Sequence, residues 1–194
     1  MSGDLNGVYL KELRSLALSL PEPYRTLCSD VLLEDLAEAL LDGTVFEIVN
    51  GLQDIQRMTE KNLFKMRCSK VQSQKAQRQS LLAEQSSELR ACATGGSGSG
   101  PASNGVESLA DLKQRHKAEL QAFDVKSRET LRETDCRIVD ELDELVNQQQ
   151  TTMEKAGVPG FRVSTFPSDI QLQMHLTRFI LLLNDRYGSR QQAR

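Results

Sequence analysis

The chain has 194 residues, of which 26% are charged and only 5% aromatic, with no Trp and a formal net charge of −3. So few large side chains are typical of a helical rod rather than of a globular enzyme core. The slightly acidic balance argues against a general affinity for nucleic acid or anionic membrane. The longest run without a polar residue, 179–183, is far shorter than the roughly 20 residues of a membrane span, so we expect no membrane insertion.

The first part of the chain, residues 5–52, predicts a set of short helices. Leucines recur at helical spacing over 5–20, and the prolines that follow end this helix. A second amphipathic helix is expected over 30–41, before an Asp-Gly stop signal. Thr44 and Glu47 then have the spacing of a capping box at the start of a third helix.

The strongest pattern is an eleven-residue repeat between residues 105 and 156. Its rows are Leu109, Leu120, Leu131, Leu142 and Met153, then Leu112, Phe123, Thr134, Leu145 and Ala156, and a mostly polar row of His116, Ser127, Ile138 and Gln149. Eleven residues per three turns keep each row on one side of a straight helix, which needs another helix to lie against. The Gly- and Ser-rich linker 93–105 lets the chain reverse. The sequence therefore predicts a long antiparallel coiled-coil hairpin over 53–156.

Two charge blocks support this reversal. Residues 57–78 contain seven basic side chains and one acidic, whereas residues 133–146 contain six acidic and one basic. Folding the chain back at about position 99 brings the blocks together and places Arg57 opposite Glu141. The charges then choose the orientation of the two helices, while the apolar rows stabilise their packing.

The chain changes character over residues 157–187. Gly157 is placed like a helix C-cap, and the next four residues, Val-Pro-Gly-Phe, suit a type II turn. An extended segment leads into a last helix, where Ser168 and Gln171 have capping-box spacing. Apolar residues cover nearly the whole circumference of this helix, so it must be buried on several sides. We expect it to pack on the N-terminal helices and form a small all-α head.

The predicted binding surface is one face of this last helix. The N-terminal helices can cover one side of it, and an apolar side left open usually marks a protein-binding site. The candidate partner-binding residues are Leu172, Leu176, Phe179, Ile180 and Leu183.

No pattern predicts catalytic, cofactor-binding or metal-binding residues. The four cysteines lie far apart, and neither histidine has a ligand-type residue four positions on. Because the chain begins without a signal peptide, we expect reduced thiols in an intracellular protein, in the nucleus, the cytoplasm or both.

Two blocks of sequence resemble a known family. They are residues 36–55, LAEALLDGTVFEIVNGLQDI, followed by Thr59-Glu60-Lys61, and residues 149–176, QQTTMEKAGVPGFRVSTFPSDIQLQMHL. Both are similar to the gonadal family, which includes the vertebrate DiGeorge-syndrome critical-region proteins. The resemblance implies a small, intracellular, helical protein linked to germ line and development, with vertebrate members mainly nuclear. It brings no catalytic or cofactor residue.

These observations predict a non-enzymatic coiled-coil adaptor or complex subunit that binds a protein of unknown identity. The alternative is a nuclear, nucleic-acid-associated factor that uses the basic run 57–78. That run offers only Phe64 for base stacking, and the acidic helix competes with phosphate, so nucleic acid is the less favoured partner. The sequence leaves open whether two hairpins pair as a homodimer.

Overall fold

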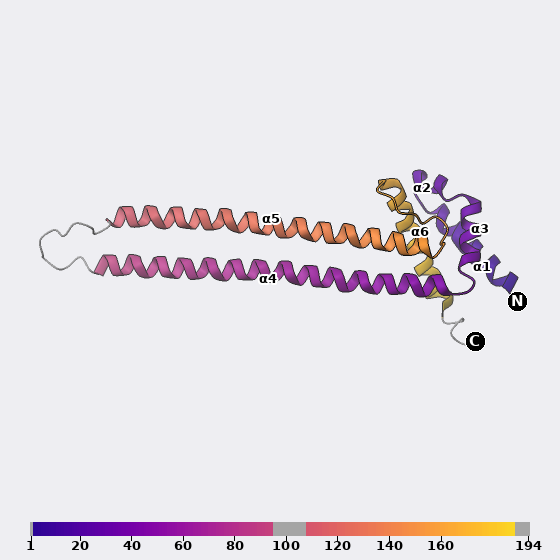
Figure 1. Ribbon diagram of the computed structural model, residues 1–194, viewed down its shortest axis with the longest axis horizontal. Helices are drawn as coiled ribbons and strands as arrows, with labels where there is room; N and C mark the ends of the chain where they lie inside the picture. Colours follow the sequence, from indigo (N-terminus) through magenta and orange to yellow (C-terminus); the bar gives the residue numbers. More distant parts are fainter. Residues whose placement is uncertain (1, 95–107, 189–194) are drawn as a thin grey trace, which may run out of the picture. The chain divides into compact units, whose positions relative to one another are not determined.

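The computed structural model describes residues 2–94 and 108–188, and all regular structure in this part is helical, which confirms the all-α class. The helices are α1 (Ser2–Leu18), α2 (Glu22–Leu27), α3 (Asp30–Ala39), α4 (Thr44–Thr94), α5 (Leu109–Lys155) and α6 (Pro167–Tyr187) (Figure 1). The chain divides into two compact units: residues 1–60 with 141–194, here the head, and residues 61–140, here the hairpin.

This division differs from the expected one in its boundaries. The head includes α4 up to residue 60 and α5 from residue 141, whereas the sequence assigned all of 53–156 to the coiled coil. The predicted linker 93–105 lies outside the described residues, except for its first two positions, which still belong to α4.

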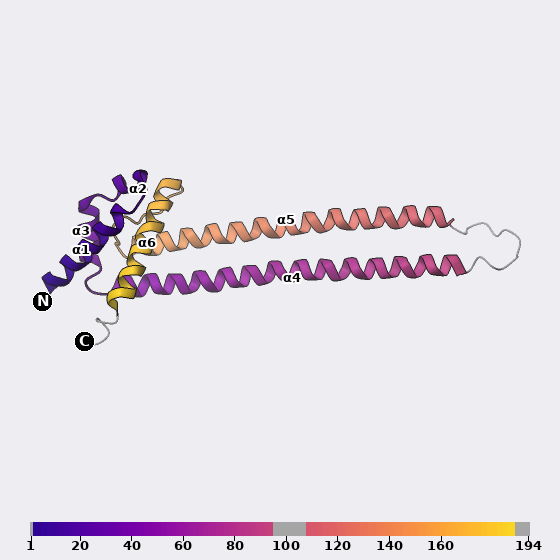
Figure 2. The same ribbon diagram turned by 180° about the vertical axis from the view of Figure 1, so that it is seen from behind.

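Within the hairpin, α4 and α5 run side by side in opposite directions, as Figures 1 and 2 show from two sides. The eleven-residue rows of α5 face α4: Leu112 and His116 are buried, and the later members of the rows are mostly half-buried. The seam between the helices is partly polar. Gln74 donates a side-chain hydrogen bond to the backbone oxygen of Ser127 at 2.8 Å, and Gln85 does the same to His116 at 3.1 Å.

Two ion pairs join the helices across this seam, and one of them, Arg67 with Asp135, links the two charge blocks. Arg67 binds Asp135 through two hydrogen bonds of 2.7 and 3.1 Å, and Arg78 binds Asp124 through two of 2.9 and 3.3 Å. The hydrogen bonds from the guanidinium groups lower the pKa of both aspartates. Such bidentate contacts form only at one axial position of α4 relative to α5, so they set the register of the hairpin.

The register differs from the expected one by about one helical turn. Residue 67 faces residue 135, where a reversal at position 99 would place residue 131. Arg57 consequently forms no ion pair with Glu141. Its Nη1 instead lies 3.9 Å from Oδ1 of Asp54 in its own helix. The reason is the position of the reversal: α4 ends at Thr94 and α5 begins at Leu109, so its midpoint lies between residues 101 and 102.

The head is built around one apolar core. Tyr9 of α1 lies fully buried between two rings, with Phe46 of α4 at 6.0 Å and Tyr187 of α6 at 5.8 Å, both edge to face. Arg14 ties α1 to α3 through Asp30 and Glu34. The largest fully buried side chains of the head are Tyr9, Leu13, Leu36, Leu40, Val49, Leu176, Ile180 and Leu183.

Neither predicted capping box forms. α4 starts at Thr44 itself, and the side chain of Asp42 accepts the hydrogen bond from the Thr44 backbone N–H at 2.9 Å. α6 starts at Pro167, which places Ser168 inside the first turn rather than before it. The short helix α2 was not predicted, because Pro21 and the proline two residues later read as helix breakers, whereas proline also suits the first turn of a helix.

The turn after α5 has the predicted form. Gly157 and Gly160 have φ angles of +70° and +82°, which favour glycine. Val158 N–H reaches back to the Met153 carbonyl oxygen at 3.1 Å, closing the end of α5, and Phe161 N–H bonds the Val158 carbonyl oxygen at 3.2 Å. This confirms the C-cap glycine and the type II turn.

Candidate functional site

A groove of about 300 Å³ opens in the head between the beginning of α4, the end of α5, Phe161 and α6. Figure 2 shows α6 crossing over these ends of α4 and α5. Each helix contributes residues at intervals of three and four, which places them on one face. The lining residues are Val49, Leu52, Gln53, Gln56, Val146, Gln149, Gln150, Met153, Phe161, Ile170, Gln173, Met174, Thr177, Arg178 and Leu181.

The walls combine apolar side chains with amides. Val49 and Met153 are buried, whereas Met174 is 61% exposed and Val146 is 37% exposed. Five of the lining residues are glutamines, and Arg178 is the only charged one. The groove can therefore hold an apolar group and still offer donors and acceptors for hydrogen bonds.

Gln150 leaves a hydrogen-bond donor unused in this wall. The side chain is 6% exposed, and its Oε1 accepts a hydrogen bond from the backbone N–H of Ser164 at 3.1 Å. Because an N–H must meet the oxygen and not the nitrogen, this contact fixes the orientation of the amide. The buried Nε2 then has no partner among the described residues. An unpaired buried donor costs about 1–3 kcal/mol and is rare in native proteins.

The segment between α5 and α6 is held in place by Asp169. The Oδ2 of Asp169 accepts hydrogen bonds from Ser164 Oγ and Arg162 Nη2, both at 2.7 Å. These bonds, from Ser164 first and then from Arg162, lower the pKa of Asp169. Gln173 adds a hydrogen bond of 2.8 Å to the backbone oxygen of Arg162. The wall that carries Phe161 is thus fixed from α6 and, through Ser164, from α5.

The structure places most of the predicted partner-binding residues inside the head. Leu176, Phe179, Ile180 and Leu183 are buried in the common core, and Leu172 is half-buried against it. In the folded head these four side chains are not exposed at the surface, and a role for them in partner binding stays a prediction. The physical reason is that α1 and α2 both pack on α6, so that the helix is covered on more sides than the N-terminal stripe alone suggested.

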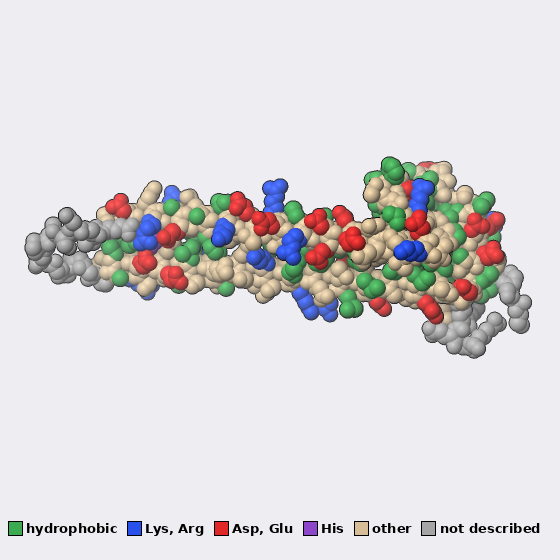
Figure 3. Space-filling view, in the orientation of Figure 1, with side chains coloured by type: hydrophobic (Ala, Val, Ile, Leu, Met, Phe, Trp, Pro, Cys, Tyr) green, Lys and Arg blue, Asp and Glu red, His purple; other side chains and the backbone are tan. Residues whose placement is uncertain are grey.

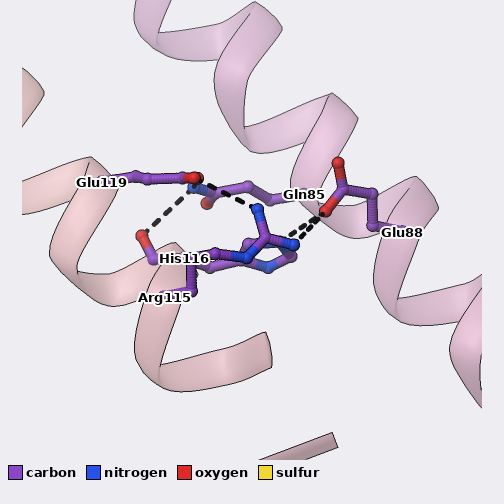
Figure 4. Close-up of polar contacts among 5 residues, drawn as sticks. All are labelled: Gln85, Glu88, Arg115, His116 and Glu119. Carbon is purple, nitrogen blue, oxygen red and sulfur yellow. Dashed lines mark hydrogen bonds and ion pairs between the residues drawn. The ribbon is translucent and has the colours of Figure 1, made fainter. Parts of the chain in front are cut away.

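A second polar cluster lies in the hairpin (Figure 4). His116 Nε2 and Arg115 Nη2 of α5 approach the same carboxylate oxygen of Glu88 on α4, at 2.9 and 3.2 Å. The hydrogen bond with His116 is the largest cause of the lowered pKa of Glu88. Gln85 Nε2 donates a hydrogen bond to Oε2 of Glu119 at 3.1 Å. These contacts join the two helices, although the buried Nδ1 of His116 has no partner among the described residues. We assign the cluster to helix pairing.

Two further candidate groups, His175 and Cys28, are engaged in packing. His175 lies against the ring of Tyr24, with centroids 5.2 Å apart. Burial raises the pKa of the Cys28 thiol, which makes it a weak nucleophile.

Figure 3 shows basic and acidic side chains interspersed along the visible face of the hairpin, with no patch of one sign. None of the described helices is both long enough and apolar enough to cross a lipid bilayer.

Comparisons with known proteins agree with the two sequence blocks. A family described as DiGeorge syndrome critical region 6 (DGCR6) protein matches residues 7–192. Protein DGCR6 of Gallus gallus is 37% identical over 184 residues, covering 95% of this chain and 86% of that protein. Gonadal protein gdl of Drosophila melanogaster is 34% identical over 173 residues, covering 89% and 76%. No solved structure matches. The predicted resemblance is confirmed, and the chain belongs to the DGCR6 family.

Proposed function

We propose that this protein is a non-enzymatic coiled-coil adaptor or complex subunit that binds another protein through the groove of the head. The observation that carries the proposal is an apolar groove whose wall holds the buried, unpaired Nε2 of Gln150. A native protein rarely leaves such a donor unpaired, and an acceptor brought by a bound partner would offset its cost.

The names of the relatives support a developmental setting. One is named for the DiGeorge syndrome critical region and the other is called a gonadal protein. We therefore propose a role in germ-line or developmental processes, in the nucleus or the cytoplasm. The groove depends on both recognisable blocks, since residues 49–53 come from the first and residues 149–174 from the second.

Affinity purification followed by mass spectrometry tests this function with a matched pair of variants. Met174→Asp puts a charge into the exposed rim of the groove. Met58→Asp makes the same change at a methionine that is 64% exposed and does not line the groove. A partner that depends on the groove is lost with the first variant and kept with the second. Identical partner sets for wild type and both variants would contradict the proposal.

The alternative partner is nucleic acid, bound through the basic run 57–78. In its favour, Phe64 is 68% exposed and offers a face for base stacking. Against it, Arg67 and Arg78 are already engaged by aspartates of α5. A salt titration decides: phosphate neutralisation gives an affinity that falls steeply with ionic strength, and a flat response argues for protein binding.

A further inference from the structure

The chemistry of the groove narrows the kind of partner, and this inference rests on the function proposed above. We infer that the groove takes a short peptide segment of another protein, which inserts one large apolar side chain. A backbone carbonyl beside that side chain accepts a hydrogen bond from Gln150 Nε2. An acidic residue of the same segment pairs with Arg178.

The size of the groove suits one large apolar side chain of a bound peptide. Pockets for small molecules span roughly 300–1,000 Å³, so that about 300 Å³ is at the lower limit. This volume holds a large side chain with its adjoining backbone. The exposed side chain of Met174 at the rim can adapt to that side chain, because methionine is unbranched and polarisable.

The amides of the wall favour a peptide over a lipid chain. Gln150 and Gln173 are both buried, and Gln173 already donates its hydrogen bond to Arg162. The buried amide nitrogen without an acceptor is therefore Gln150 Nε2, and a peptide carbonyl can accept a hydrogen bond from it. A hydrocarbon chain has no acceptor and would leave the donor unpaired.

Charge complementarity specifies the flanking residue. Arg178 is the one charged side chain of the lining, and no ion pair joins it to a carboxylate in the described part of the chain. An Asp or Glu of the partner gains a charge-assisted contact there.

The chain's own remaining segments do not suit the groove. Residues 95–107 and 189–194 contain no aromatic residue, Leu, Ile or Met, and the second segment carries Arg190 and Arg194, of the same sign as Arg178. A separate protein is the better occupant.

The test begins with the full-length protein and a display library of random twelve-residue peptides. One enriched peptide, labelled with fluorescein, then reports binding by anisotropy. We expect a large apolar residue close to an Asp or Glu. Met174→Asp should abolish binding and Met58→Asp should leave it unchanged. Gln150→Met should weaken binding about three- to tenfold, the effect of losing one hydrogen bond. Arg178→Glu should weaken it too, with recovery when the peptide's acid is replaced by Lys.

The outcomes separate this inference from the proposed function. If Met174→Asp abolishes binding while Gln150→Met and Arg178→Glu change nothing, the peptide chemistry is wrong and the groove remains a protein-binding site. If no groove variant affects the enriched peptide, both fail. If no peptide is enriched, the inference is overturned, and self-association that Met174→Asp abolishes would then name a second copy as the occupant.

Discussion

The backbone N–H of Ser164 donates a hydrogen bond to Oε1 of Gln150 across 3.1 Å, and thereby orients a buried amide whose other end has no partner in the described structure. The same Ser164 reaches Asp169 through its hydroxyl group. One residue of an irregular segment thus links α5 to α6, and it orients the buried amide of a residue that lines the groove.

Gln150 and Gln173 form a matched pair for measuring the unused donor. Both are buried and both line the groove, but only Gln173 Nε2 has an acceptor. We expect Gln173→Met to lower the free energy of unfolding by about 1–2 kcal/mol, whereas Gln150→Met should change it by less than about 1 kcal/mol, because the lost Ser164 contact is offset by removal of the unpaired donor. Urea unfolding measures both. An equal cost at the two positions would mean that Gln150 Nε2 is already satisfied.

Gly160 should resist substitution. An alanine Cβ would lie 2.6 Å from Leu176 Cδ1 and 3.1 Å from Leu32 Cδ1, at a φ of +82°. We expect Gly160→Ala to destabilise the head by about 1–3 kcal/mol. Gly51→Ala is the control, because nothing lies within 4 Å of its Cβ and the site is helical, so stability should rise by about 0.5–1 kcal/mol. Thermal unfolding of the two variants should shift in opposite directions.

Leu176 is predicted to act as core and not as surface. Leu176→Ala should cost about 2–5 kcal/mol, since the side chain is fully buried. Met174→Ala, on the same helix but largely exposed, should cost less than about 0.5 kcal/mol. Circular dichroism melts distinguish them. A Leu176→Ala protein that melts like wild type and yet loses its partner would restore the original expectation of a binding surface at that residue.

The anchor at Asp169 predicts a pH dependence. Its pKa in the folded state lies below the unfolded value, so its stabilising effect is complete above the unfolded pKa, near 3.8, and is lost as the pH falls through the folded value. Asp169→Asn should therefore lower the melting temperature at pH 7, and the difference from wild type should shrink below about pH 4. Asp185→Asn, at an exposed position of α6, is the control. A difference that stays constant down to pH 2 would show that the carboxylate charge is not involved.

The register of the hairpin can be tested by exchanging charges. Arg67→Asp and Asp135→Arg should each lower the melting temperature, because each brings like charges together at a distance where Arg67 and Asp135 now form two hydrogen bonds. The double variant should recover most of the loss, and recovery should decrease at high salt. If the double variant loses as much melting temperature as the two single variants together, residues 67 and 135 do not face each other.

The parts of the fold that follow from local spacing could be predicted from the sequence. The rows through Leu112 and His116 face inward, because helical periodicity alone decides which side of α5 is buried. The exact reversal point depends on where α4 and α5 end, and a run rich in Gly and Ser does not define that position. The capping boxes failed for a similar reason: Thr44 and Ser168 have suitable spacing, but the helices begin at other residues.

The groove could not be predicted, because three helices and a loop converge on it. Periodicity states that Gln149 and Gln150 lie near the inward side of α5, but not that Phe161 and α6 close over them. The available signal was the polar row that includes Gln149, since a glutamine at an inward position needs a hydrogen-bond partner. For α6, apolar residues on all sides indicated burial correctly, and Leu176 lies in the core of the head.

The unpaired amide of Gln150 also equips the native protein with its own reporter. Hydrogen bonding strongly affects the chemical shifts of a side-chain NH₂ group, so these two protons should resonate apart from those of glutamines that are bonded or in water. Their signal would move when an acceptor arrives and stay still when a molecule binds elsewhere. A spectrum of nitrogen-15-enriched protein can therefore follow occupancy of the groove without a fluorophore on either molecule.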